Sequence, residues 1–260
     1  MGHPRLHHVR RGAGEPLLLI MGMAGHHRMW GEPFLGLLEP DFDVVAFDNR
    51  GIGTSDRADD PFTVADLADD AARVLDDVGW DSAHVFGISL GGMIAQELVL
   101  RHPERVRTLT LGCTYPGTGG DLTAPGPRRA LEAGMTGDQE LSVRTMFDVN
   151  VSAAFAGAAG NYDVFRETAL AERVPIPVVM MQSQAVFGHD ALERLSTITA
   201  PTLVIHGTAD EMLLPVNAEL IAKAVPGARL ELFEGVGHLF WWEEPERTAA
   251  LLREHAGPPA

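Results

Sequence analysis

Short apolar runs separated by turn-forming residues recur along the chain. Each run is rich in leucine, isoleucine, valine or phenylalanine and is bounded by glycine, proline or aspartate, which is typical of buried β-strands. The predicted strands are Leu17 to Met21, Val44 to Phe47, His84 to Phe86, Thr108 to Leu111, Thr202 to His206 and Arg229 to Phe233. A sheet built from such strands needs helices that cover both of its faces.

Segments with helical periodicity alternate with these runs. In Val64 to Val78 apolar residues recur every three or four positions, and aspartates occupy the opposite face. The same pattern is found in Met93 to Arg101, Pro215 to Ala224 and Pro245 to His255. Parallel strands need crossovers, and right-handed crossovers place helices on both faces. The alternation therefore predicts an α/β fold with a mostly parallel sheet, whose catalytic groups lie beyond the carboxyl ends of the strands.

The regular alternation stops between about residues 115 and 199. This stretch opens with a run rich in glycine and proline, and helical pieces follow at Arg128 to Glu132, Leu141 to Phe147, Tyr162 to Ala171 and Val178 to Phe187. We predict a helical lid at 115–199, inserted into a core made of 1–114 and 200–260. A loose connection is the alternative, and the small residues at 153–160 favour it.

Length and charge limit the classes of function. A chain of 260 residues with 45% apolar content is expected to form one core. Its 36 acidic and 20 basic residues give a net charge of −16, which disfavours binding to nucleic acid or to anionic membranes. The sequence gives no indication of the oligomeric state.

The cysteine count and the N-terminal segment predict the compartment. A single cysteine, Cys113, cannot form an internal disulfide, and its apolar surroundings favour a core thiol over a reactive one. The first apolar run, Leu17 to Met21, is too short for a signal peptide or a membrane span. We therefore expect a cytoplasmic protein.

The strongest chemical motif is a serine between two glycines. Gly87-Ile88-Ser89-Leu90-Gly91 follows the strand His84 to Phe86 and precedes the helical segment Met93 to Arg101. This order of strand, sharp turn and helix is that of a nucleophile elbow, in which a serine adopts a strained backbone conformation. The flanking glycines, Gly87 and Gly91, are needed because side chains there would collide with the neighbouring strand and helix. The sequence thus predicts Ser89 as a nucleophile.

A serine hydroxyl needs a general base and a group that orients that base. Asp210 follows the strand Thr202 to His206, and His238 follows the strand Arg229 to Phe233. Each residue alone is more typical of a turn or a surface loop. Together with Ser89, at three strand ends, they predict a Ser-His-Asp triad with His238 as base and Asp210 as the orienting acid.

Acyl transfer also needs N–H donors for the oxyanion, each contributing about 3 kcal/mol. Leu90, at the start of the helix, is expected to supply one donor. The second is assigned to Met23, in a loop where Gly22 and Gly25 let the backbone turn inward. A plain strand-to-loop turn is the alternative for this segment.

No metal or organic cofactor is predicted. His26 and His27 are adjacent and project differently, and the chain has neither an H-E-x-x-H nor a C-x-x-C motif. We interpret these two histidines as loop residues, more typical of solvated surface than of a pocket mouth.

With these motifs the chain resembles the α/β-hydrolase superfamily, in particular small bacterial serine esterases and enol-lactonases, over nearly its whole length. The segment Asp48 to Ser55 is similar to the family's D-x-R-G-x-G-x-S turn. Gly207 to Asp210, with Pro215 five residues after the acid, resembles the family's acid loop, and Gly237 to Pro245 resembles its histidine loop. One departure is Met21-Gly22, where the family often has His-Gly.

The resemblance implies hydrolysis of an ester or lactone through an acyl-enzyme. Two alternatives use the same fold: a hydroxynitrile-lyase-like or cofactor-free perhydrolase activity, and a non-catalytic ligand-binding protein. A pure binding protein has no need for a complete triad, which disfavours the latter.

The substrate is expected to be a small hydrophobic ester or lactone. Methionine and phenylalanine side chains in the lid would form an adaptable apolar wall, although such residues more often pack a lid onto its core. The predicted substrate-binding residues are Met23, Trp30, Met146 and Leu239.

Overall fold

The computed structural model describes residues 3–257 and contains one seven-stranded sheet. The strands lie in the order β1-β3-β2-β4-β5-β6-β7, and every neighbouring pair is parallel except β1 and β3. Their bounds are β1 His8–Gly12, β2 Glu15–Ile20, β3 Phe42–Phe47, β4 Ala83–Ile88, β5 Val106–Gly112, β6 Thr202–Gly207 and β7 Arg229–Phe233. The predicted α/β fold with a mostly parallel sheet is confirmed.

The sequence analysis missed β1. This strand reads His-Val-Arg-Arg-Gly and carries no apolar run, because it lies at the edge of the sheet and is half exposed. Its partner β3 holds it in antiparallel register, from His8 opposite Phe47 to Gly12 opposite Asp43.

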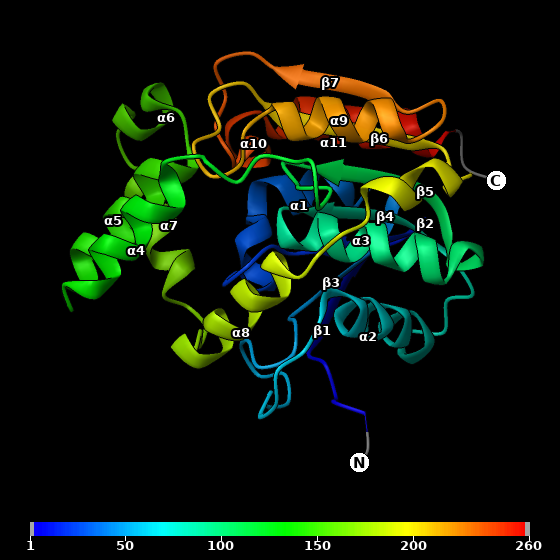
Figure 1. Ribbon diagram of the computed structural model, residues 1–260, viewed down its shortest axis with the longest axis horizontal. Coiled ribbons are helices and arrows are strands. Elements are labelled where there is room, and N and C mark those ends of the chain that lie inside the picture. The colour runs from blue at the N-terminus through cyan, green and yellow to red at the C-terminus, as the bar shows by residue number, and fades with distance from the viewer. Residues whose placement is uncertain (1–2, 258–260) are drawn as a thin grey trace.

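Helices cover both faces of the sheet (Figure 1). On one face α2 Val64–Asp77, α3 Leu90–Arg101 and α9 Val216–Ala224 pack over alternate strand residues such as Leu18 and Ile20. On the other face α1 Glu32–Leu38 and α11 Pro245–Ala256 pack over the intervening residues, Leu17 and Leu19. Because successive side chains of a strand point to opposite faces, the sheet separates two apolar cores. The remaining short helices of the body are η1 His27–Trp30, η2 Pro103–Arg105, η3 Leu192–Thr197 and α10 Phe240–Glu243.

Five α-helices, followed by the short helix η3, connect β5 to β6. They are α4 Gly126–Met135, α5 Gln139–Asn150, α6 Ala153–Gly157, α7 Asn161–Ala169 and α8 Ile176–Phe187. Figure 1 shows α4 to α7 beside the end of the sheet toward which the arrows of β5 and β7 point. Four of these helices overlap the predicted pieces. The fifth, α6, lies where small residues favoured a loose connection, and the side chain of Ser152 begins it by accepting a hydrogen bond from Phe155 N.

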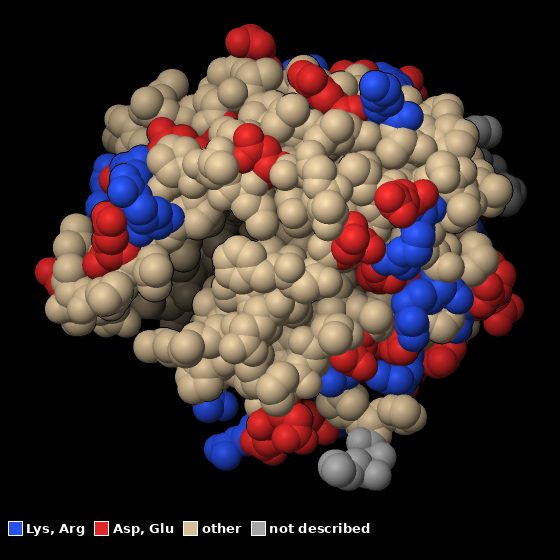
Figure 2. Space-filling model, viewed as in Figure 1, with Lys and Arg blue, Asp and Glu red and all other residues tan. Residues whose placement is uncertain are grey.

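The surface is hollowed between these inserted helices and the body, as Figure 2 shows at the left of the view. The hollow lies on the side of the molecule where the parallel strands end. The division into a core and a lid at residues 115 and 199 stays a prediction. Within residues 3–257 no helix combines the length and the apolar character that crossing a bilayer requires.

Candidate active site

Ser89 occupies the sharp turn between β4 and α3. Its backbone has φ +53° and ψ −123°, a region that residues with a side chain rarely adopt. A Cβ atom at Gly87 would lie 2.2 Å from the Gly91 carbonyl oxygen, and one at Gly91 would lie 2.0 Å from the Ile20 carbonyl oxygen. The two glycines are therefore required by the close approach of strand and helix, as expected from the sequence. Ser89 itself is half-buried, so its hydroxyl is within reach of solvent and small molecules.

Asp210 and His238 meet in front of the strand ends. Asp210 lies just beyond β6 and His238 lies in the loop after β7. His238 Nδ1 is 2.7 Å from Asp210 Oδ2, and both side chains are buried. A carboxylate on Nδ1 fixes the imidazole tautomer that leaves Nε2 free to accept a proton.

Asp210 forms hydrogen bonds with Met212 N, Leu213 N and His238 Nδ1, and His206 Nε2, which is 2.8 Å from the Leu213 carbonyl oxygen, lies beside it. Asp210 Oδ1 accepts hydrogen bonds from Met212 N at 2.7 Å and Leu213 N at 3.0 Å, while His206 Nε2 lies 3.0 Å from Oδ2. Burial alone would raise the pKa of this carboxyl, but the charge of His238 and the hydrogen bonds from His206 and His238 hold the pKa well below its usual range. Asp210 is therefore a carboxylate at neutral pH. The sequence analysis did not assign a role to His206, although a histidine ending an apolar strand four residues before Asp210 was a visible signal.

Cys113 lies beside the histidine. It is fully buried, its backbone has φ +38°, and its Sγ is 3.7 Å from His238 Nε2. Burial, and then the charge of Asp210, raise the pKa of the Cys113 thiol well above its usual value, so the group is a neutral thiol. This agrees with a core thiol, but the sequence analysis did not place it next to His238, which lies 125 residues away.

Ser89 Oγ makes no hydrogen bond to His238 within residues 3–257. Such bonds are often long before substrate binds and tighten in the reacting complex. The structure therefore brings Asp210 and His238 into direct contact, and it places Ser89 at the carboxyl end of β4, which β5 separates from β6.

The two candidate oxyanion donors lie on the loop after β2 and at the start of α3. Leu90 is the first residue of α3, where a backbone N–H has no partner within the helix. Met23 lies in a turn closed by a hydrogen bond from Gly25 N to the Gly22 carbonyl oxygen at 3.2 Å. The next residue, Ala24, has φ +59°, and its N–H donates to Gln182 Oε1 of α8 at 2.9 Å. The inserted helix α8 thus holds the loop that carries Met23.

Met21 replaces the histidine that the family often has before this glycine. Its side chain is buried, and its carbonyl oxygen accepts a hydrogen bond from Asn49 Nδ2 at 3.2 Å. The start of the loop is therefore anchored to the turn after β3.

A second contact joins the histidine loop to the insertion. Glu243 Oε1 accepts hydrogen bonds from Gly237 N at 2.8 Å and from Ser152 N at 2.9 Å, and Ser152 Oγ donates to Glu243 Oε2. In addition, Leu239 N donates to the Asn150 carbonyl oxygen at 2.8 Å. The residues on either side of His238 are thus tied to the segment between α5 and α6.

The predicted substrate-binding residues differ in exposure. Met23 and Met146 are 38% and 36% exposed, whereas Leu239 is buried. Trp30 is completely buried against Phe86 and Trp241. It borders a cavity of about 510 Å³ between η1, α7 and α10, whose lining includes none of the three predicted triad residues. This placement favours core packing for Trp30 over contact with a substrate at Ser89.

The two adjacent histidines are not surface residues. His26 and His27 are only 1% and 8% exposed, so the expectation of a solvated loop pair is wrong. His27 N donates to Asp48 Oδ1 at 2.6 Å just beyond β3, and burial lowers the pKa of His26.

The fold and these strand-end residues define a member of the α/β hydrolases. A family model described as the alpha/beta hydrolase fold matches residues 15–245, so the chain belongs to this family. Over 286 aligned residues it is 31% identical to rhodomycin D methylesterase DnrP of Streptomyces peucetius, covering 94% of this chain and 91% of that protein. Over 240 residues it is 29% identical to poly(3-hydroxyalkanoate) depolymerase of Ectopseudomonas oleovorans, covering 91% and 82%.

A solved structure supports the same conclusion. A hydrolase from Pseudomonas aeruginosa PA01 matches with a TM-score of 0.85 at 28% identity, covering 98% of this chain and 95% of that one. The expected superfamily is confirmed, and the relatives support a hydrolase.

Proposed function

We propose that the protein is a serine hydrolase that cleaves a small, hydrophobic carboxylic ester or lactone through an acyl-enzyme. The observation that carries the proposal is the pairing of His238 Nδ1 with the buried Asp210 carboxylate at 2.7 Å, at the same edge of the sheet as a serine held at φ +53°. An ordinary glycine turn has no need for a strained serine at the sheet edge where a carboxylate orients an imidazole.

The proposed reaction has two steps. Ser89 Oγ attacks the carbonyl carbon while His238 Nε2 takes the hydroxyl proton and passes it to the departing alkoxide, which leaves as an alcohol. A water molecule then attacks the acyl carbon and gives a proton to His238, which passes it to Ser89 Oγ as the bond to the acyl carbon breaks and the carboxylic acid is released. In a lactone the departing oxygen stays attached to the acyl group, so a single hydroxy acid is the product.

The negative charge that develops on the carbonyl oxygen would be stabilised by the N–H groups of Leu90 and Met23. The start of α3 favours an anion at Leu90 because the helix dipole is positive at that end. No metal or organic cofactor takes part in this scheme.

Exposed apolar side chains on the loop after β2 and on the inserted helices support a hydrophobic substrate. Met23 and Met146 are exposed, and so are further apolar side chains on α4 and α8: Leu131, Met135, Ile176, Met180 and Phe187. Methionine adapts its shape readily, which suits a wall that accepts several acyl or alcohol groups.

The test is intact-mass analysis after treatment with a fluorophosphonate, together with hydrolysis of a panel of short-chain p-nitrophenyl esters. We expect one covalent adduct and turnover in the wild type, and loss of both in Ser89→Ala. The exposed Ser196→Ala exchange is the matched control and should keep both. An unlabelled but folded wild type would overturn the proposal and favour a ligand-binding protein. An adduct without ester turnover would instead favour a lyase or perhydrolase on the same residues.

A further inference from the structure

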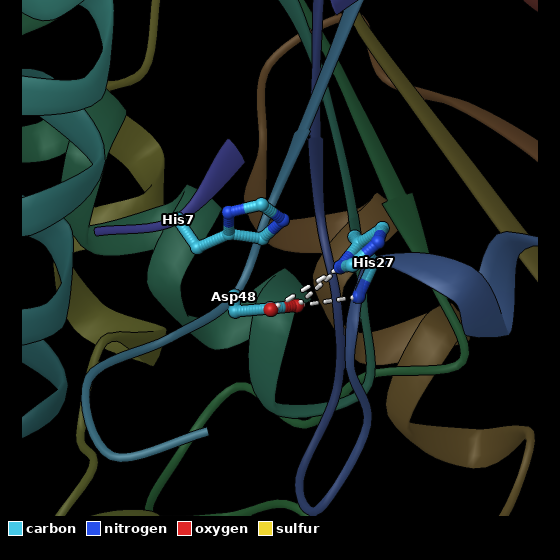
Figure 3. Close-up of side chains that lie close together, drawn as sticks. All are labelled: His7, His27 and Asp48. Carbon is cyan, nitrogen blue, oxygen red and sulfur yellow. Dashed lines mark hydrogen bonds and ion pairs between the residues drawn. The ribbon is translucent and has the colours of Figure 1, made fainter. Parts of the chain in front are cut away.

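Three potential metal ligands converge outside the catalytic candidates. His7 precedes β1, His27 begins η1, and Asp48 follows β3. Figure 3 shows that the two imidazole rings and the carboxylate, each on a different one of these segments, lie close together. One ligand atom of each residue lies within 4.8 Å of the other two. Because the ligands are up to 41 residues apart in the chain, no local motif reveals them.

The spacing of the donor atoms suits one ion. His27 Nδ1 lies 3.0 Å from Asp48 Oδ1 and 3.2 Å from Oδ2. Two ligands on a tetrahedral zinc ion, each about 2.0–2.2 Å from the metal, are separated by roughly 3.3 Å. The imidazole rings of His7 and His27 are 4.9 Å apart at their centroids. The three donor atoms lie within 4.8 Å of one another, so binding of one ion requires side-chain rotation that brings them closer together.

Backbone contacts hold the three segments in place without an ion. Asp48 N donates to the His7 carbonyl oxygen at 2.9 Å, and His7 N donates to Ser55 Oγ at 2.9 Å. His27 N donates to Asp48 Oδ1 at 2.6 Å, and Oδ2 lies 3.2 Å from His27 Nδ1, which is itself one of the three proposed ligand atoms. A site ordered in this way loses little conformational entropy on binding.

The local charge favours a cation. Asp48 is completely buried, and within residues 3–257 it forms no ion pair with arginine or lysine. The nearby Arg50 pairs with Asp70 instead. Within the same residues the His7 ring forms no hydrogen bond. A buried carboxylate is costly unless a positive charge compensates it, and an ion on Oδ2 would also engage the His7 ring.

We propose that His7, His27 and Asp48 bind a divalent transition-metal ion, with zinc the best match to two imidazoles and one carboxylate. His27 Nδ1 would release its proton on binding. The fourth position is open to water, because half-buried His7 also borders a polar cavity of about 570 Å³ lined by Arg5, Leu6, His8, Thr54 and Asp77. The ion would cross-link the N-terminal segment, the loop after β2 and the turn after β3. This inference is independent of the proposed hydrolase activity.

The test is zinc binding by the chelator-treated full chain, measured by calorimetry with zinc sulfate and by metal analysis after dialysis. The variants are His7→Ala, the adjacent His8→Ala as matched control, and Cys113→Ala, because Cys113, Asp210 and His238 form a second group of potential ligands. We expect one ion in the wild type, His8→Ala and Cys113→Ala, and affinity at least about tenfold weaker in His7→Ala.

Two results would overturn the proposal. One is a wild type that takes up no zinc. The other is binding that survives His7→Ala but is lost in Cys113→Ala, because the ion would then lie at the catalytic candidates. Circular dichroism without zinc checks folding, and His7→Gln replaces His7→Ala if the latter does not fold. Zinc should also raise the melting temperature of the wild type more than that of either His7 variant.

Discussion

The strand-end loops and the inserted helices use their side chains in opposite ways. In the loops, Asp210 and His238 are buried, and three hydrogen bonds hold the Asp210 carboxylate. In the insertion, Met135, Ile176 and Phe187 are 79%, 76% and 76% exposed. Proton transfer needs donors and acceptors fixed to within a fraction of an ångström, whereas recognition of an apolar group tolerates adjustment. Under the proposed function, the comparison assigns chemistry to the first region and selectivity to the second.

The two regions are nevertheless coupled through buried polar contacts. Gln182 of α8 accepts the Ala24 N–H, and Glu243 joins Gly237 to Ser152. A change at such a contact should alter the geometry at Ser89 without removing a reacting group. Variants in the loops, in the insertion and at the contact therefore measure how separate the two regions are.

The largest expected effect is in the loops. In Asp210→Asn we expect kcat for a p-nitrophenyl ester to fall by about 10³-fold or more, with KM nearly unchanged. The amide cannot stabilise the imidazolium of His238, and its NH₂ group favours the wrong tautomer. Asp70→Asn is the control, because this buried carboxylate lies on α2 and pairs with Arg50. A kcat in Asp210→Asn within tenfold of the control would show that Asp210 takes no part in catalysis.

A second effect concerns stability in the insertion. His189 follows α8 and is buried, with Nε2 3.4 Å from Gln96 Oε1. Burial, opposed by the charge of Glu97, lowers the pKa of His189 from 6.5 to about 4. The unfolded chain therefore binds the extra proton first, so the stability that His189 contributes is complete above about pH 6.5 and is lost as the pH falls toward 4.

The corresponding variant is His189→Asn, which stays neutral at every pH in this range. A pKa shift of this size corresponds to at most about 3 kcal/mol. We expect the urea-unfolding free energy of the variant to fall less steeply than that of the wild type between about pH 6.5 and 4. The exposed His3→Asn exchange should leave the wild-type slope unchanged. Equal slopes in all three proteins would show that His189 is not buried as a neutral group.

The sequence predicted those parts of the molecule that short segments encode. The strand, glycine turn and helix around Ser89 follow directly from local pattern, because the close approach of β4 and α3 excludes side chains at Gly87 and Gly91. The β1 strand could not be predicted in this way. Its residues are polar, and pairing with β3 alone makes it a strand.

The missed site residues depend on contacts between distant segments. Cys113 meets His238 across 125 residues, and Gln182 meets Ala24 across 158. Nothing in the neighbouring sequence of Cys113 or Gln182 distinguishes it from an ordinary core residue. The burial of His26 and His27 could not be predicted for the same reason. A polar pair in a loop is expected at the surface, but contacts with distant segments bury it.

The smallest effect is expected at the contact between the two regions. Gln182 is completely buried and its Oε1 accepts the Ala24 N–H at 2.9 Å, so it acts as a positioning residue for the loop that carries Met23. Gln182→Leu keeps the volume of the side chain but removes the acceptor. We expect kcat to fall roughly tenfold while KM changes little, because a displaced Met23 N–H weakens stabilisation of the oxyanion and not binding of the ester.

Gln184→Leu is the matched control for this variant, because Gln184 lies two residues further along α8 and is exposed. Gln182→Glu supplies the rescue, since it keeps an acceptor oxygen for Ala24 N and should recover part of kcat. If Gln182→Leu instead raises KM and leaves kcat unchanged, α8 contributes only to the apolar wall that contacts the substrate. The Met23 N–H would then be positioned by the turn from Gly22 to Gly25 alone, and the two regions would be separable in function as well as in structure.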